Sequence, residues 1–168
     1  MSGLGPYVRA LTLFVAGVVV GTAMMSPSAA QEKRNAGLRL NHVGISVKNY
    51  EESLNFYTKT MGFREAFALQ GPDGKPTLTS LEINPDTFLE VTTATADRPS
   101  GITHIGLGTD DVKAAVARLR QAGVNISDPR VGSTRAVITS FSDPNGIRLE
   151  LNELGPDALE RKAVESFK

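Results

Sequence analysis

Two histidines and two glutamates stand at matching places in the two halves of this sequence. His42 lies in the stretch Asn41-His42-Val43-Gly44, and His104 lies in Thr103-His104-Ile105-Gly106. They are the only histidines in the chain, and each is followed at a similar distance by a glutamate, Glu90 or Glu150, between apolar neighbours. Imidazoles and carboxylates are residue types that bind divalent metal ions. The duplicated His…Glu unit is therefore the first candidate for chemistry.

The elements that must position these residues follow the same order in both halves. Period-two alternation predicts strands and apolar stripes at helical spacing predict helices. In the first half we expect strands over 38–47, 63–69, 76–84 and 87–93, with a helix between Asn49 and Gly62. In the second half we expect strands over 102–108, 124–129, 134–141 and 147–152, with a helix between Asp110 or Asp111 and Gly123. Each half is a βαβββ module, and the repeat is about 60 residues long.

Strand alternation places the four residues on one face of the predicted sheet. Successive side chains of a strand point to opposite faces. Leu149 and Leu151 pack under a helix, so Glu150 points the other way. Glu90 stands in the same way between Leu89 and Val91, and both histidines lie on the face away from the helices. We therefore expect an α+β fold in which two tandem modules form a curved, cup-like mixed sheet, with helices on the outer face and the four residues on the concave face.

Composition and the ends of the chain exclude several classes of function. The 18 basic and 18 acidic residues balance and are scattered, which argues against a nucleic-acid partner. The absence of cysteine excludes disulfides and thiolate metal sites. Residues 1–30 have the pattern of a signal peptide, with Arg9, an apolar run and a small-residue cleavage site at Ala30. We expect cleavage after Ala30 and a periplasmic or secreted protein without a membrane partner; the alternative is an uncleaved N-terminal membrane anchor.

The sequence divides into four parts. Residues 1–30 are the signal peptide, 31–37 a linker, 38–153 a single domain with modules 38–94 and 102–153, and 154–168 a C-terminal tail that reads as a short amphipathic helix or a frayed end.

The paired modules resemble the vicinal oxygen chelate superfamily. The resemblance lies in the His-Val/Ile-Gly-Ile/Leu opening of each half, the Leu-Glu-Val/Leu strand that closes each, and the turn Asp143-Pro144-Asn145-Gly146, and it covers about 38–153. Glyoxalase I, methylmalonyl-CoA epimerase, fosfomycin resistance proteins, extradiol dioxygenases and bleomycin-binding proteins belong to this superfamily. Within it, the glyoxalase I and epimerase branch is the nearest. That branch has a glyoxalase-like (VOC) domain with a metal centre on its concave face.

The resemblance implies a specific ligand set and reaction. The metal ligands would be His42, Glu90, His104 and Glu150, around one divalent ion such as Ni, Co, Mn, Fe or Zn. The activity would be that of a lyase or isomerase on a small hydroxy-carbonyl substrate, with Glu90 or Glu150 as the base that removes a proton next to a carbonyl. The glyoxalase I pattern has an arginine where this chain has Ser46, which argues against glutathione as co-substrate.

Two other functions and several residue roles stay open at this point. The first alternative function is that of a non-catalytic, resistance-type ligand-binding protein. The second is that of an Fe(II) dioxygenase with His42, His104 and Glu150 as iron ligands. Arg148 shares the concave face and would bind an anionic substrate group or form an ion pair with a glutamate. Phe88 and Phe141 would line a substrate pocket or belong to the core. The cup forms within one chain or is shared in a homodimer.

Overall fold

The computed structural model describes residues 37–167, and the residues from Leu38 onward form one compact unit. The first module contains β1 (Arg39–Val47), α3 (Tyr50–Asn55), which continues into the short π-helix η1 (Phe56–Thr60), β2 (Arg64–Gln70), β3 (Pro76–Asn84) and β4 (Thr87–Thr93). The second contains β5 (Gly101–Gly108), α4 (Val112–Gln121), β6 (Arg130–Val131), β7 (Val137–Ser142) and β8 (Arg148–Glu153), and the chain continues into α5 (Leu159–Ser166).

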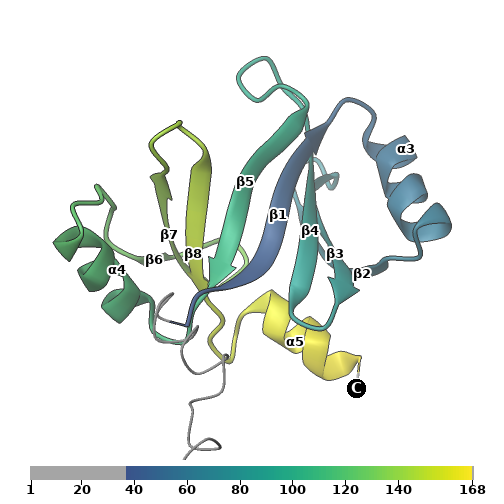
Figure 1. Ribbon diagram of the computed structural model, residues 1–168. Helices are drawn as coiled ribbons and strands as arrows, with labels where there is room; N and C mark the ends of the chain where they lie inside the picture. The colour runs from purple at the N-terminus through teal and green to yellow at the C-terminus, as the bar shows by residue number, and fades with distance from the viewer. Residues whose placement is uncertain (1–36, 168) are drawn as a thin grey trace, which may run out of the picture. The chain divides into compact units, whose positions relative to one another are not determined.

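The strands form one mixed sheet in the order β2-β3-β4-β1-β5-β8-β7-β6 (Figure 1). Within each module the first and last strands are parallel neighbours, β1 with β4 and β5 with β8. The two modules join through the antiparallel pair β1–β5. The predicted α+β fold with two βαβββ modules is therefore confirmed. The β1–β5 pair lies inside one chain, so both modules belong to one continuous sheet.

Two apolar clusters on the outer face of the sheet pack the helix of each module against its strands. Under α4, buried side chains of the helix pack on β8, with Leu151 fully buried. Under α3, the helix packs on β3 and β4, where Leu81 and Val91 are fully buried. Both clusters use alternate residues of their strands, so the intervening residues, which include the glutamates, face the concave side.

The predicted helix boundaries follow from local caps. The Asn49 side chain accepts a hydrogen bond from the Glu52 N–H, and the Asp111 side chain accepts one from the Ala114 N–H. Gly62 and Gly123 follow the two helical segments with positive φ, as expected of residues that end a helix.

The second module departs from the prediction in two places. No strand forms over 124–129, because Ile126 inserts into the core under α4 and its carbonyl accepts hydrogen bonds from the Arg120 guanidinium. The strand expected over 134–141 begins only at Val137. Arg135 has a φ of 64° in the tight turn before it, which is incompatible with an extended strand.

The C-terminal tail is a helix with its own place in the fold. The Leu159 N–H donates a hydrogen bond to the Thr134 carbonyl, and α5 packs against β2. Figure 1 shows α5, in yellow, across the lower end of the sheet. Among residues 37–167, no helix is long and apolar enough to cross a membrane.

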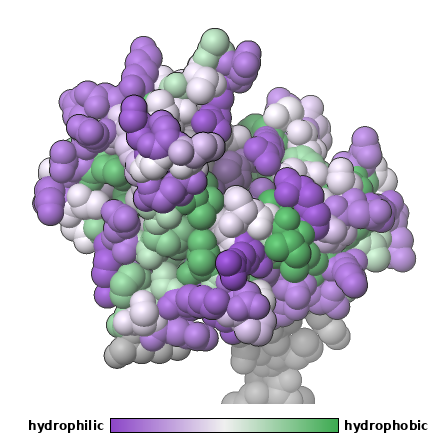
Figure 2. All heavy atoms as spheres, turned by 180° about the vertical axis from the view of Figure 1, so that it is seen from behind, coloured by the Kyte–Doolittle hydropathy of each residue, from purple (hydrophilic) through white to green (hydrophobic). Residues whose placement is uncertain are grey.

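The predicted signal peptide and all but the last residue of the predicted linker lie outside the described residues. The face opposite to that of Figure 1 carries apolar side chains in patches separated by hydrophilic ones (Figure 2).

Candidate metal centre

The two histidines and two glutamates converge on the concave face. The Nε2 atoms of His42 and His104 lie 2.9 Å apart. Glu90 Oε2 lies 3.9 Å from His42 Nε2 and 3.6 Å from His104 Nε2, and Glu150 Oε1 lies 3.7 Å from His42 Nε2. One ligand atom from each of His42, His104 and Glu150 fits within a span of 4.8 Å. His42, His104 and Glu150 therefore point at one small volume, and Glu90 lies beside the two histidines without joining that compact group.

These separations match the ligand shell of one divalent ion. Two ligand atoms about 2.1 Å from a metal lie about 3.0 Å apart at right angles and about 4.2 Å apart in trans positions. The four distances between ligand atoms fall within or next to this range. His42, His104 and Glu150, with Glu90 beside them, would hold one divalent ion here.

The residue before each histidine sets the direction of its ring. The Asn41 Oδ1 and His42 Nδ1 atoms lie 2.9 Å apart, and the Thr103 Oγ1 and His104 Nδ1 atoms lie 3.0 Å apart. The Asn152 amide also donates to Asn41 Oδ1, so this oxygen is an acceptor and His42 Nδ1 carries the proton. Nε2 of His42 is then left with a lone pair, which is the form that binds a metal.

The glycine two residues after each histidine makes room for the other histidine. In the β1–β5 ladder Gly44 stands opposite His104, and Gly106 stands opposite His42. A Cβ atom on Gly44 would lie 2.1 Å from His104 Cε1, and one on Gly106 would lie 2.1 Å from His42 Cε1. The repeated His-x-Gly motif is therefore a reciprocal clearance between the modules.

Burial sets the charge states of the centre. It lowers the pKa of His42 and of His104 to about 4, and the positive charge of Arg148 lowers both further. Burial raises the pKa of Glu90 and of Glu150 to about 7, an effect that Arg148 opposes. Both imidazoles are thus neutral at pH 7, and in the absence of an ion a proton on His104 Nε2 can join the two Nε2 atoms in a hydrogen bond. When both rings carry their proton on Nδ1, the two Nε2 lone pairs point at one position beside the glutamates, so the donor set fits a metal ion.

The three predicted substrate-binding residues lie in different parts of the structure. Arg148 reaches the rim of the centre: its Nη2 lies 3.6 Å from Glu150 Oε2 and donates to the Ser140 hydroxyl. Phe88 is fully buried and stands beside His42 in the β1–β4 ladder. Phe141 packs on the outer core under α4, because it pairs with Leu149 on the helix side. Phe141 therefore does not line a pocket at this centre, and that expectation is corrected.

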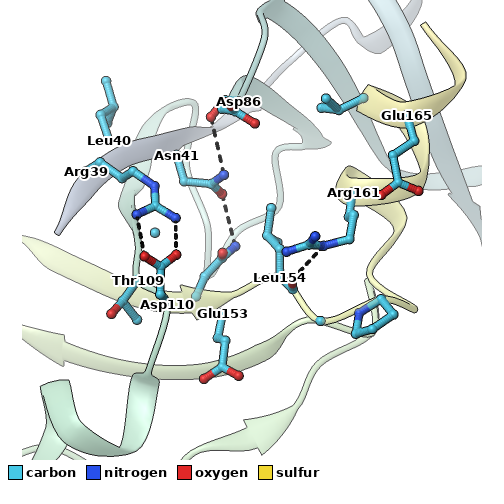
Figure 3. A pocket seen from close by; sticks show the side chains of 15 residues that line it. Arg39, Leu40, Asn41, Asp86, Thr109, Asp110, Glu153, Leu154, Arg161 and Glu165 are labelled. Carbon is cyan, nitrogen blue, oxygen red and sulfur yellow. Dashed lines mark hydrogen bonds and ion pairs between the residues drawn. The ribbon is translucent and has the colours of Figure 1, made fainter. Parts of the chain in front are cut away.

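A separate pocket lies behind the centre, at the end of the sheet (Figure 3). It encloses about 600 Å³ between the start of β1, the ends of β5 and β8, and α5. Asn41 and Asn152 belong to its wall, but none of the four ligands does. An ion pair between Arg39 and Asp110, with N and O 2.6 Å apart, borders it. The pocket touches the support of His42 and not the ligand atoms.

Sequence reasoning missed the supporting residues of the centre. Asn41 lies at an irregularity in the β1–β5 register, where simple alternation does not tell which face it takes. The repeated glycines were visible as a motif, but their purpose depends on the pairing of β1 with β5. Thr103 and Asn152 left no separate signal in the sequence.

The fold and the centre together define a class of protein, one with two βαβββ modules around a site for a divalent ion. The profile of the Glyoxalase/Bleomycin resistance protein/Dioxygenase superfamily matches residues 39–151, and the chain belongs to this superfamily.

Its relatives include lyases and epimerases. The lactoylglutathione lyase of Escherichia coli O157:H7 is 29% identical over 126 residues, which cover 69% of this chain and 93% of that protein. The enzyme of the same name from Neisseria meningitidis serogroup A is 30% identical and covered to 88%. A solved structure of Streptomyces coelicolor methylmalonyl-CoA epimerase, in complex with 2-nitronate-propionyl-CoA, superposes with a TM-score of 0.61 and 27% identity, over 71% of this chain and 96% of that one.

Proposed function

We propose that the protein is a metal-dependent lyase or isomerase that acts on a small hydroxy-carbonyl compound. The observation that carries this proposal is the convergence of His42, Glu90, His104 and Glu150 within one chain of this superfamily. The relatives named above are a lyase and an epimerase, which supports this reaction class.

The side chains of the centre divide the work in this proposal. A divalent ion held by the four ligands would polarise two substrate oxygens and stabilise the enediolate that forms when a proton leaves the neighbouring carbon. Either Glu90 or Glu150 is suited to remove that proton, because a pKa near 7 allows a carboxylate to accept and return a proton at neutral pH. Arg148 at the rim would bind an anionic group of the substrate.

The surroundings of Ser46 support a substrate without a glutathione carrier. Ser46 lies at the place where the glyoxalase I pattern has an arginine. It is buried, and its hydroxyl donates to the Pro99 carbonyl. It therefore supplies no positive charge for a peptide carboxylate.

Metal content and proton exchange test the proposal. We would purify residues 31–168 without a histidine tag, reconstitute with Ni, Co, Mn, Fe and Zn in turn, and measure bound metal by mass spectrometry for the wild type, His42→Ala and Glu90→Ala. We expect about one ion per chain in the wild type and a loss in both variants. The loaded wild type should exchange the α-protons of hydroxyacetone for deuterium in D₂O, observed by NMR. Absence of bound metal under every condition would refute the enzyme proposal.

One observation favours a second candidate. His42, His104 and Glu150 form a compact set of two histidines and one carboxylate, which is the ligand set of non-haem Fe(II) oxygenases. In that case Glu90→Ala would keep its iron while His42→Ala would lose it. A metal-loaded protein that binds hydroxy-carbonyl compounds without proton exchange would instead be a binding protein.

We further propose that the protein is exported, on the basis of the signal-peptide pattern of residues 1–30. Expression of the full chain in a Gram-negative host, followed by fractionation and N-terminal sequencing, should yield a periplasmic product beginning at Gln31. A full-length product in the membrane fraction would show the N-terminal anchor instead.

A further inference from the structure

Helix α5 connects opposite edges of the sheet. Its first residue hydrogen-bonds to Thr134, in the turn between β6 and β7, at one edge of the strand order. At its other end the ring of Phe167 stacks on the Arg64 guanidinium, 3.3 Å from its centroid. Arg64 belongs to β2, the strand at the opposite edge. An eight-residue helix reaches both edges only if the sheet is curled and the helix crosses the opening of the cup.

The inner face of this helix carries a glutamate in a position suited to an apolar residue. Glu160, Ala163 and Phe167 follow at helical spacing. Glu160 is 1% exposed and Ala163 is 6% exposed, whereas Arg161 and Lys162 are exposed. The buried side of α5 therefore presents one carboxylate toward the inside of the cup.

The Glu160 carboxylate has no settled partner in the fold. Neither of its oxygens makes a well-formed hydrogen bond. Burial, with the negative charges of Glu90 and Glu150, raises its pKa to about 7, and contacts with its own backbone N–H and with the Thr134 hydroxyl offset this only in part. A buried carboxylate without a partner is costly, so such groups persist mainly where a ligand or a reaction uses them.

Glu160 differs from the two glutamates of the centre because it is not one of the proposed metal ligands. Glu90 and Glu150 point their oxygens at the histidine nitrogens and are committed to the ion in the proposed function. Glu160 belongs to the helix that crosses the cup, and its carboxylate lies near enough to Glu90 and Glu150 for their negative charges to act on it. A substrate that enters the centre from the side of this helix would lie next to the Glu160 carboxylate.

We propose that Glu160 is a catalytic residue, a carboxylate that faces the substrate from the C-terminal helix and exchanges a proton with the carbon next to its carbonyl. This inference rests on the metal-dependent reaction of the proposed function, and it assigns the role of the base to Glu160 in place of Glu90 or Glu150, which then both stay on the ion. In the forward step the proton passes from the carbon to a Glu160 oxygen, the C–H electron pair becomes the C=C bond, and the carbonyl π pair moves to oxygen. Glu160 then returns the proton to the neighbouring carbon, the C=C pair forms the new C–H bond, and the hydroxyl proton moves to the former carbonyl oxygen as the hydroxyl becomes the new carbonyl, so the isomerisation balances without an oxidant or a further reactant.

A hydroxamate tests the position of Glu160 without turnover. Acetohydroxamate binds metal ions through two oxygens, and its N–H occupies the place of the carbon that loses a proton. A base aimed at that carbon accepts a hydrogen bond from this N–H. We would load the wild type, Glu160→Gln and Glu160→Asp with Co²⁺, measure the bound Co²⁺, and titrate acetohydroxamate by calorimetry and by the visible spectrum. Glu165→Gln, an exposed change on the same helix, is the matched control.

We expect Glu160→Gln to keep its Co²⁺ and to bind acetohydroxamate at least about tenfold more weakly. Glu160→Asp should fall between the two, and the control should match the wild type. Equal hydroxamate affinity in wild type and Glu160→Gln would overturn the inference and leave the proposed function standing. Loss of Co²⁺ in Glu160→Gln would also overturn it, because Glu160 would then support the ion. A wild type that fails to bind Co²⁺ or hydroxamate would overturn the proposed function and this inference with it.

Discussion

The substitution Gly44→Ala should weaken metal binding at least about 100-fold without changing any ligand. The added Cβ would lie 2.1 Å from Cε1 and 2.3 Å from Nδ1 of the His104 ring, and 2.7 Å from the Thr103 hydroxyl. Carbon atoms in contact lie about 3.5 Å apart or more. The His104 ring must therefore move by more than about 1 Å, while a metal site tolerates about 0.2 Å in its ligand distances.

The expected size of the effect follows from these displacements. Loss of ligand support alone costs about 10- to 100-fold in affinity, and displacement of the ligand itself should cost at least about 100-fold, or about 2.7 kcal/mol. Overpacking of the strand should cost about 1–3 kcal/mol of folding stability, partly offset because alanine suits a strand better than glycine. The variant should therefore remain folded.

Calorimetric titration with Zn²⁺ or Ni²⁺ and a thermal melt, run in parallel, measure both quantities. Gly155→Ala is the matched control, because a Cβ there has no heavy atom within 4 Å and the residue lacks a positive φ. Gly106→Ala should repeat the result through His42. Wild-type metal affinity in a folded Gly44→Ala protein would refute the reciprocal clearance.

Three further predictions follow from the centre and from α5. Asn41→Ala removes the acceptor of His42 Nδ1 and should weaken metal binding about 10- to 100-fold by calorimetry; unchanged affinity would show that the ring is held by other contacts. Metal binding should release about one to two protons at pH 6 and almost none at pH 8.5, because Glu90 and Glu150 have pKa values of about 7 and hold protons only below about that pH. The metal affinity should therefore fall as the pH drops below 7. Calorimetry in buffers of different ionisation enthalpy measures the number of protons released, and a number that is constant with pH would contradict this prediction. In the metal-free protein Glu160→Gln should be stabilising by up to roughly 3 kcal/mol above pH 7. The folded pKa of Glu160, about 7, lies above the ordinary value of 4.5, so the wild type loses stability as the pH rises between these values, and a melting-temperature difference that does not grow over this window would count against the burial argument.

Much of the centre was predictable because strand alternation is a local property. Glu90 and Glu150 each stand between residues that pack on the outer core, so their direction follows from their neighbours. Alternation was not sufficient for Phe141, whose pairing with Leu149 puts it on the helix side. It was not sufficient for Asn41 either, since an irregularity in the β1–β5 register places it against His42.

The sequence by itself determined the two modules and the ligand types, because a repeat of about 60 residues with period-two strands leaves little choice of which side chains share a face. Only the tertiary structure decided how the modules meet. The β1–β5 register sets Gly44 against His104, and the curl of the sheet lets α5 reach both edges and bury Glu160. Both depend on contacts between residues far apart in the chain, which no local pattern encodes.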